Sequence, residues 1–281
     1  SSAPPRRGVE ARTRGQGGRV SVGTHARLDL VGIGEAMVLF QTPFGETLEE
    51  ASTSRVDVAG AELNVCATLA RFGSRTALLT RVGDDPSGRR VLRAMRDHQV
   101  DTSLVALDER CTGALIRETL RDGERRVSYH RAGSAASGMD ASDARRIPVA
   151  DAPAMLLVSG LTAALGSGPR GAMRAAIDRC GEATALVVDA NLRPSLGNLD
   201  ESVTFLKSVL GTTAILLLGD DEAEALFGTR EVHEVFRIAA AAGVRETVLK
   251  AGPGGVWFHD GDGWSVLAAA DKRLTEVRRA I

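Results

Sequence analysis

The sequence has few cysteines and no long apolar run, and both absences narrow the classes of protein it can belong to. Its 281 residues include only three cysteines, Cys66, Cys111 and Cys180, and no C-x-x-C pair. Scattered thiols in odd number argue against a disulfide framework or a zinc site, and they indicate reduced thiols of a cytoplasmic protein. The most apolar stretch, residues 214–218, is far shorter than the roughly 20 residues that cross a bilayer. We therefore expect no membrane partner.

The sequence also lacks an excess of charge of either sign. It carries 35 Lys and Arg against 36 Asp and Glu, a formal net charge of −1. This balance predicts no nucleic-acid partner. Residues 1–26 hold scattered arginines but almost no large apolar side chains, which predicts a disordered tail. Anion binding by these arginines is the weaker alternative, and no signal-peptide pattern is recognisable among them.

From residue 28 onward, short apolar runs alternate with longer helical patterns. Several of these runs are apolar throughout, as strands are in a sheet that is covered on both faces. The alternation predicts an α/β fold with a parallel sheet. We expect strands at 28–33, 77–82, 155–159, 186–189, 215–218, 247–250 and 256–259, and helices at 61–71, 87–99, 169–180, 200–210, 220–226 and 231–242.

Residues 112–130 break this alternation. They read as two strands around a turn at 121–124, where Asp122-Gly123 is a strong hairpin signal because both residues tolerate positive φ. Segments 38–42 and 55–59 are candidates to pair with them. The pattern predicts a small β lid, built from about 37–60 and 111–132, on a main domain that spans 27–270.

Polar residues and glycines follow two of the expected strands, at the edge where ligands bind in open α/β sheets. Asn191 and Arg193 follow the strand that ends at 189; Asn donates and accepts hydrogen bonds, and Arg offers a planar fork to carboxylate or phosphate. Gly252 and Gly255 follow the strand that ends at Lys250, where glycine lets backbone amides approach a phosphate. Each segment taken alone is equally consistent with an ordinary turn.

Three further positions are candidate ligand contacts. Tyr129 and Arg131 alternate on one lid strand, so both side chains should lie on one face and suit a polar, anionic ligand. Taken alone, the pair is better explained as an ordinary exposed strand face. Asn64, in the first turn of helix 61–71, is placed either to reach a ligand at the sheet edge or simply to satisfy backbone groups. Glu222 begins the helix after strand 215–218, where a carboxylate holds hydrated Mg²⁺ or simply complements the helix dipole.

Two common nucleotide motifs are missing. The sequence has no G-x-x-x-x-G-K-[ST] phosphate-binding loop. The run that begins Gly32-Ile33-Gly34 has Met37 where a dinucleotide fingerprint requires its third glycine. A dehydrogenase on a doubly wound sheet is therefore disfavoured.

Taken in order, the motifs resemble those of the ribokinase-like (PfkB-type) carbohydrate kinases, above all the branch that acts on 2-keto-3-deoxygluconate. The resemblance runs from about residue 28 to about 267 and is carried by segments 59–64, 69–73, 83–88, 129–135, 159–162, 189–193 and 222–228. It implies a three-layer α/β/α sheet with a small β lid. It also implies transfer of the γ-phosphoryl group of ATP to a sugar hydroxyl with the help of Mg²⁺.

The resemblance assigns roles by position. The sugar acid would be bound by Gly60, Asn64, Tyr129, Arg131 and Arg193. The two arginines would face its carboxylate, and Arg193 is also the candidate catalytic residue. The ATP site would be lined by Asn191, Lys250, Gly252 and Gly255, while Glu222 would help to organise Mg²⁺. Lid strands of such kinases often pair between subunits, so the resemblance implies a possible homodimer.

The sequence departs from the family pattern at three places. Ala59 replaces the first of two paired glycines, and Gly219 stands where Asn is common. The family's Gly-Ala-Gly-Asp loop, which supplies a general base and an anion-binding helix N-terminus, is expected after 264–267. No glycine follows Asp271, so this aspartate is not assigned as the base. We expect a C-terminally truncated or frameshifted kinase with an atypical tail at 271–281 and impaired activity; the alternative is an inactive sugar- or nucleotide-binding pseudokinase.

Overall fold

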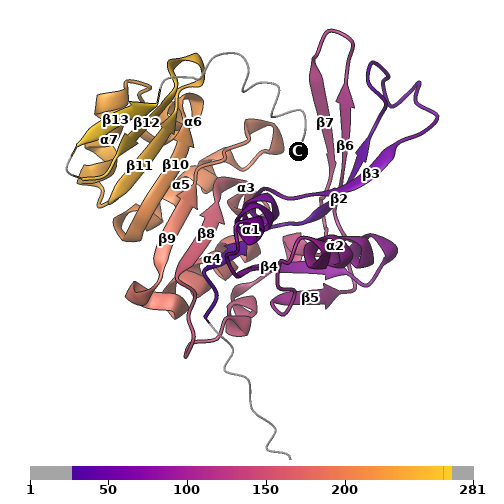
Figure 1. The fold of residues 1–281 in the computed structure, drawn as a ribbon, viewed down its shortest axis with the longest axis horizontal. Helices are drawn as coiled ribbons and strands as arrows, with labels where there is room; N and C mark the ends of the chain where they lie inside the picture. The colour runs from indigo at the N-terminus through magenta and orange to yellow at the C-terminus, as the bar shows by residue number, and fades with distance from the viewer. Residues whose placement is uncertain (1–26, 262, 268–281) are drawn as a thin grey trace, which may run out of the picture.

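The computed structural model describes residues 27–261 and 263–267, and its centre is one large, mostly parallel β-sheet (Figure 1). The strand order is β13-β12-β11-β10-β9-β8-β1-β4-β5. The expected strands are all present, and 105–108 and 264–267 complete the sheet. Its strands are β1 (Leu30–Ile33), β4 (Thr76–Gly83), β5 (Val105–Asp108), β8 (Met155–Ser159), β9 (Ala185–Asp189), β10 (Thr213–Gly219), β11 (Glu246–Lys250), β12 (Val256–His259) and β13 (Trp264–Leu267).

The last two strands depart from the parallel arrangement. β12 runs antiparallel to β11, and β13 runs antiparallel to β12. The turn 251–255 between β11 and β12 is too short for the crossover that a parallel pair requires. The glycines predicted at the ligand-binding edge thus form a tight connection between two antiparallel strands.

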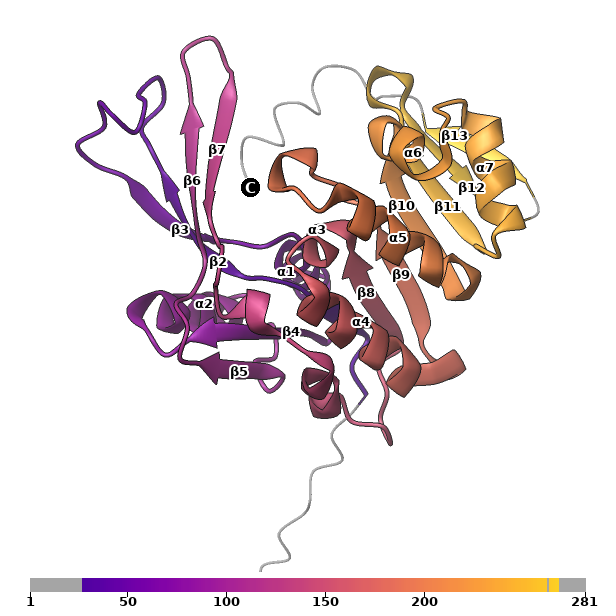
Figure 2. The same cartoon turned by 180° about the vertical axis from the view of Figure 1, so that it is seen from behind.

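Helices cover both faces of the sheet, which confirms the three-layer α/β/α prediction. Helices α4, α5, α6 and α7 lie on one face (Figure 2), while α1 lies on the opposite face. Alternate residues of β1 serve the two layers, since Val31 and Ile33 pack in one buried cluster and Leu30 in the other. The helices are α1 (Ala61–Arg71), α2 (Pro86–Asp97), α3 (Gly160–Ala163), α4 (Ser167–Cys180), α5 (Leu199–Val209), α6 (Asp220–Phe227) and α7 (Val232–Ala241).

Capping side chains and proline fix the helix boundaries more closely than the spacing of apolar residues in the sequence can. Helix α2 begins at Pro86 because the Asp85 carboxylate caps it by accepting a hydrogen bond from the amide of Gly88, and proline fits the first helical position. The helix ends at Asp97, two residues before the predicted end, and Gln99 adopts a positive φ of 61°.

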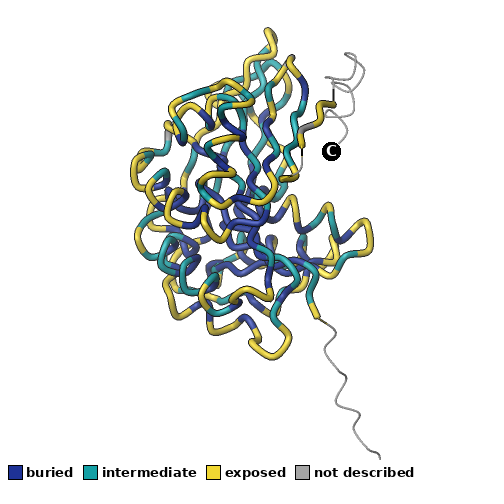
Figure 3. The backbone as a smooth tube through the Cα atoms, turned by 90° about the vertical axis from the view of Figure 1, so that its left-hand side faces the viewer, coloured by how far each residue is buried: buried dark blue, intermediate teal, exposed yellow. Residues whose placement is uncertain are grey.

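The β lid is a separate sheet that projects from the main body (Figures 1 and 2). Its strands, in the order β3-β2-β6-β7, are β2 (Met37–Gln41), β3 (Arg55–Ala59), β6 (Ala114–Thr119) and β7 (Arg125–His130). The predicted hairpin is present, with Gly123 at a φ of 87° and the amide of Leu120 bonded to the carbonyl of Glu124 at 2.9 Å. Figure 3 shows the contrast in burial between the exposed loops and the buried centre of the molecule.

Several predictions concern residues that the structure does not describe. The proposed disordered tail at 1–26, the atypical tail at 271–281 and the absence of a catalytic loop after residue 267 all lie outside the described residues. Within 27–261 and 263–267, no helix is both long enough and apolar enough to cross a membrane.

Candidate functional site

The roots of the lid converge on a buried ion pair between Glu35 and Arg131. Nε of Arg131 lies 2.6 Å from Oε2 of Glu35, and the side chains are only 8% and 1% exposed. The hydroxyl of Ser134 donates to the other carboxylate oxygen, Oε1, at 2.6 Å. Burial raises the pKa of Glu35, an effect that the positive charge of Arg131 opposes.

Arg131 keeps hydrogen-bonding capacity despite this partner. Its Nε and Nη1 atoms are buried, yet neither has a well-aligned acceptor among the described residues. The guanidinium carbon also lies 5.5 Å from the centre of the Tyr129 ring. The two predicted lid residues are therefore together, as expected, although Arg131 follows the end of β7 rather than lying within it.

A cavity of about 590 Å³ opens between the lid and the main domain beside this pair. Tyr129 and Arg131 line it from the lid side, and Leu161 and Asn198 from the main domain. Its walls combine apolar groups with a few polar ones, as small-molecule sites do. This cavity is the candidate sugar site.

The other three residues predicted for the sugar, Gly60, Asn64 and Arg193, do not line this cavity. Gly60 is buried at the root of β3, where a Cβ atom would come within 2.7 Å of the Glu35 carbonyl oxygen. Glycine is therefore needed there for close packing. Asn64 is exposed on α1, and Arg193 is half-exposed just before a short 3₁₀ turn at Pro194–Leu196.

A second group of predicted residues gathers at the carboxyl ends of β9, β10 and β11. Asp189 ends β9, and Lys250, at the end of β11, places its Nζ atom 3.7 Å from Oδ1 of Asp189. Asn191, which follows, is buried with a φ of 34°, a conformation that asparagine tolerates. Gly252 and Gly255 have φ values of 51° and 89°, so glycine is favoured at both positions of the turn.

Glu222 joins this second group through backbone contacts. Its Oε2 accepts a hydrogen bond from the amide of Gly219 at 2.6 Å, and its Oε1 accepts one from the amide of Leu192 at 3.2 Å. Arg193 Nη1 lies 3.7 Å from the same Oε1. Both oxygens therefore brace the loop, which suits a metal contact through water better than direct ligation. No cluster of three or more potential metal ligands occurs among the described residues.

The donor set fits ATP and Mg²⁺ at this second group. A lysine and glycine-rich backbone suit phosphate oxygens, and Oδ1 of Asp189 is buried without a hydrogen-bond partner in the described part of the chain. Burial raises the pKa of Asp189, and the charge of Lys250 opposes that rise. Carboxylates with few partners at a sheet edge are suited to hydrated Mg²⁺.

Sequence reasoning missed two buried carboxylates at this edge, Glu35 and Glu62. Glu62 of α1 accepts hydrogen bonds from the hydroxyls of Ser159 and Thr162, the latter at 2.8 Å. Burial raises its pKa. The signal in the sequence was an acidic residue inside an otherwise apolar or small segment, where only a paired or protonated carboxylate can be buried.

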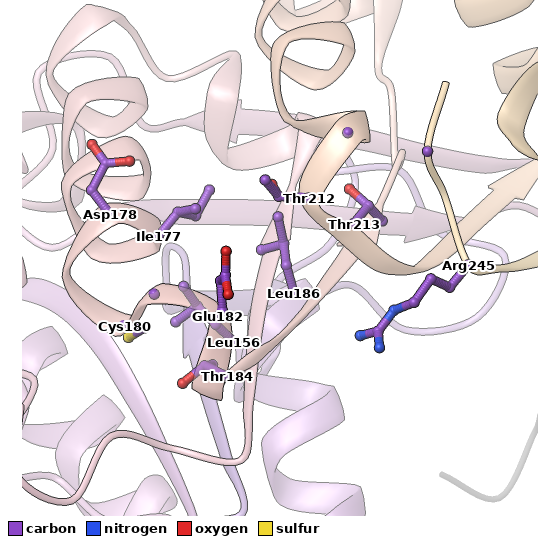
Figure 4. A pocket seen from close by; sticks show the side chains of 13 residues that line it. Leu156, Ile177, Asp178, Cys180, Glu182, Thr184, Leu186, Thr212, Thr213 and Arg245 are labelled. Atoms are coloured by element: carbon purple, nitrogen blue, oxygen red, sulfur yellow. The ribbon is translucent and has the colours of Figure 1, made fainter. Parts of the chain in front are cut away.

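A different hollow of about 440 Å³ lies at the amino ends of the strands (Figure 4). Thr184, Leu186, Thr213 and Arg245 are among its lining residues, and none of the predicted site residues reaches it. Since ligands of open α/β sheets bind at the carboxyl ends of strands, we do not assign the active site there.

The family model for "pfkB family carbohydrate kinase" matches residues 27–273. A 2-dehydro-3-deoxygluconokinase of Thermoproteus tenax is 32% identical over 250 residues, which cover 85% of this chain and 75% of that protein. The crystal structure of a PfkB protein from Polaromonas sp. JS666 superposes with a TM-score of 0.79 at 29% identity, covering 87% of this chain and 83% of the other.

A putative ribokinase II from Escherichia coli, solved in complex with ATP and Mg²⁺, shares the fold. Its TM-score is 0.77 at 17% identity, with 87% of this chain and 79% of that one covered. The match of the family model spans all of the described residues, including the lid and both groups of site residues. The chain belongs to the pfkB family of carbohydrate kinases.

Proposed function

We propose that this protein transfers the γ-phosphoryl group of ATP to a hydroxyl of a sugar acid resembling 2-keto-3-deoxygluconate. The observation that carries this proposal is Arg131, a buried guanidinium with unsatisfied donors that lines the cavity under the lid. A carboxylate is the natural partner for such a group, since Arg binds it with strong, charge-assisted hydrogen bonds. The T. tenax relative bears the name of a sugar-acid kinase, which supports this choice.

In this proposal the two groups of residues have different roles, one toward the sugar acid and the other toward ATP and Mg²⁺. Tyr129 and Arg131 bind and orient the sugar acid from the lid, with Gly60 and Asn64 near the lid root and Arg193 beside the nucleotide group. Asn191, Lys250, Gly252 and Gly255 would hold ATP, and Glu222 would hold hydrated Mg²⁺, which would neutralise phosphate charge. In phosphoryl transfer of this kind, most of the catalysis comes from positioning and charge stabilisation.

Proton acceptance from the sugar hydroxyl is not assigned to a described residue. Glu35 is held by Arg131 and Ser134, and Glu62 by two hydroxyls, so neither is a free base. The family's base follows the strand that corresponds to 264–267, beyond the described residues. A sugar-binding pseudokinase is the alternative that a measurement of turnover distinguishes from the kinase.

A coupled kinase assay with ATP, Mg²⁺ and 2-keto-3-deoxygluconate tests the proposal, paired with calorimetric titration of the same sugar acid. Turnover supports the kinase. Binding without turnover supports the pseudokinase. Absence of both contradicts the assignment of the sugar acid.

A kinase of a neutral ketose is the second candidate, and one observation favours it. Glu35 already compensates the charge of Arg131, so the net positive charge offered to a ligand is smaller than the arginine alone suggests. Replacing the sugar acid with fructose in the same assay distinguishes the two substrate classes.

A further inference from the structure

Glu35 lies where the roots of the lid strands meet the central sheet. A single residue separates it from the end of β1, and a single residue separates it from the start of β2. Its carbonyl oxygen packs against Gly60 at the root of β3, and a Cβ at Gly113, beside β6, would come within 2.5 Å of Oε1. Its carboxylate contacts Arg131, which follows β7. One buried residue thus lies against the bases of β3, β6 and β7, through its carbonyl oxygen at β3 and through its carboxylate at the other two.

The carboxylate of Glu35 is itself held in place. Ser134 donates its hydroxyl hydrogen to Oε1 and accepts one from the amide of Ser137 at 3.2 Å. The amide of Ser134 in turn donates to the carbonyl of Arg131 at 3.0 Å. The loop after β7 therefore fixes Glu35, and Glu35 fixes the Nε side of the guanidinium.

An arginine can serve two carboxylates because its donors form a rigid planar fork. Nε lies 2.6 Å from Oε2 of Glu35 as an ion pair, and neither Nε nor Nη1 makes a well-aligned hydrogen bond among the described residues. The side chain of Arg131 also lines the cavity. A ligand carboxylate can therefore approach the guanidinium from the cavity while Glu35 stays at the Nε side.

We propose that Glu35 is a positioning residue, which holds the side chain of Arg131 at the cavity wall, where its guanidinium can bind the carboxylate of the sugar acid. This role rests on the proposed function, because it presumes a carboxylate ligand under the lid. Glu35 itself touches no reacting atom. It acts through Arg131, and Ser134 acts through Glu35.

The test measures binding of 2-keto-3-deoxygluconate and of fructose by calorimetry in the full chain and its variants. Glu35→Ala should weaken binding of the acid about tenfold or more, and Glu35→Gln, which keeps an acceptor for Nε, should restore most of it. Fructose affinity should change little in either variant. Glu124→Gln, a change at an exposed lid carboxylate paired with Arg126, is the matched control and should leave both affinities unchanged.

Two further variants keep the proposal falsifiable if Glu35→Ala does not fold. Ser134→Ala, which frees Oε1, should weaken binding of the acid about threefold without affecting fructose. In an Arg131→Ala background, Ser134→Ala should have no additional effect on acid binding, because a residue that acts through another is silent when that other is removed.

Each outcome has a distinct meaning. If the unmodified chain binds no sugar acid, the proposed function fails and Glu35 has no carboxylate to serve. If it binds the acid but Glu35→Ala and Ser134→Ala bind it equally well or better, the positioning role is overturned while the function stands. Equal losses for acid and fructose would show that Glu35 only maintains the fold, and would also overturn the proposal.

Discussion

Nζ of Lys250 lies 3.7 Å from Oδ1 of Asp189, so a cation from β11 faces a partly buried carboxylate from β9 across the intervening strand β10. The lysine side chain is half-exposed, and it leaves Asp189 able to accept further hydrogen bonds. Oδ1 of Asp189 makes no hydrogen bond within the described residues. This pair marks the place where phosphates and Mg²⁺ are expected to meet.

Lys250→Ala should weaken ATP binding about tenfold, since a hydrogen bond to a charged group is worth about 1.5–3 kcal/mol. The change removes a cation next to the glycine turn 252–255. Calorimetric titration with ATP and Mg²⁺ measures the effect. Lys207→Ala, at an exposed lysine in the last turn of α5, is the control and should bind ATP normally. Equal affinity in the two variants would remove Lys250 from the nucleotide site.

Arg131→Ala should weaken binding of the sugar acid by at least tenfold and leave fructose binding nearly unchanged, because only the acid offers a carboxylate. The same change strips Glu35 of its partner, and a buried unpaired carboxylate costs several kcal/mol unless it takes up a proton. The free energy of unfolding should therefore fall as well. Arg126→Ala, at an exposed lid arginine, separates the local effect from a general loss of positive charge. Parallel loss of acid and fructose binding would contradict the carboxylate assignment.

Glu62→Gln should stabilise the protein relative to the unmodified chain as the pH rises. Burial raises the pKa of Glu62 in the folded state above its ordinary value of 4.5, so between those two values the folded state holds a proton that the unfolded state has released. Stability attributable to this group is then fully present below about 4.5 and declines with rising pH, by at most ~1.4 kcal/mol per pH unit. Glutamine mimics the protonated form and removes the decline.

Urea unfolding at pH 5 and pH 8 measures this difference. The gain of Glu62→Gln over the unmodified chain should be larger at pH 8 than at pH 5. A gain that is the same at both values, or a loss that grows with pH, would mean that Glu62 is ionised in the folded protein.

Gly160→Ala should destabilise the fold by about 1–3 kcal/mol, the usual cost of overpacking a close contact. A Cβ there would meet the carbonyl oxygen of Ala190 at 2.1 Å, and the backbone cannot move aside without disturbing the loop that carries Asn191. Gly171→Ala, inside α4, is the matched control, because the nearest atom to its new Cβ would be 4.0 Å away. That change should be neutral or stabilising by up to about 1 kcal/mol. Thermal unfolding of the two variants decides the matter, and similar melting temperatures would refute the packing argument.

The fold could be predicted from the sequence because its strand, helix and turn patterns are local and agree with one another. Apolar runs such as 155–159 predicted buried strands, and Asp122-Gly123 predicted the lid hairpin that the structure contains. The resemblance of ordered motifs supplied the family. The antiparallel edge was missed because the length of the turn 251–255, rather than the apolarity of the flanking runs, decides strand direction.

The candidate site was only partly predictable, because pairing between distant residues leaves little trace in one sequence. Arg131 could be proposed as a ligand contact, but its partner Glu35 lies 96 positions earlier in the chain. No feature of the sequence around either residue indicates that the two are in contact. The same holds for Glu62, whose hydroxyl partners Ser159 and Thr162 come from β8 and α3. Pairing of lids between two subunits stays a prediction, which size-exclusion chromatography with light scattering can test.

The most direct test of the account is calorimetric titration of the unmodified chain with 2-keto-3-deoxygluconate and, separately, with fructose. The account predicts that the acid binds at least tenfold more tightly, because the unsatisfied donors of Arg131 are matched to a carboxylate. Equal affinities, or tighter binding of fructose, would contradict it and would indicate that Glu35 leaves no effective positive charge for an acidic substrate.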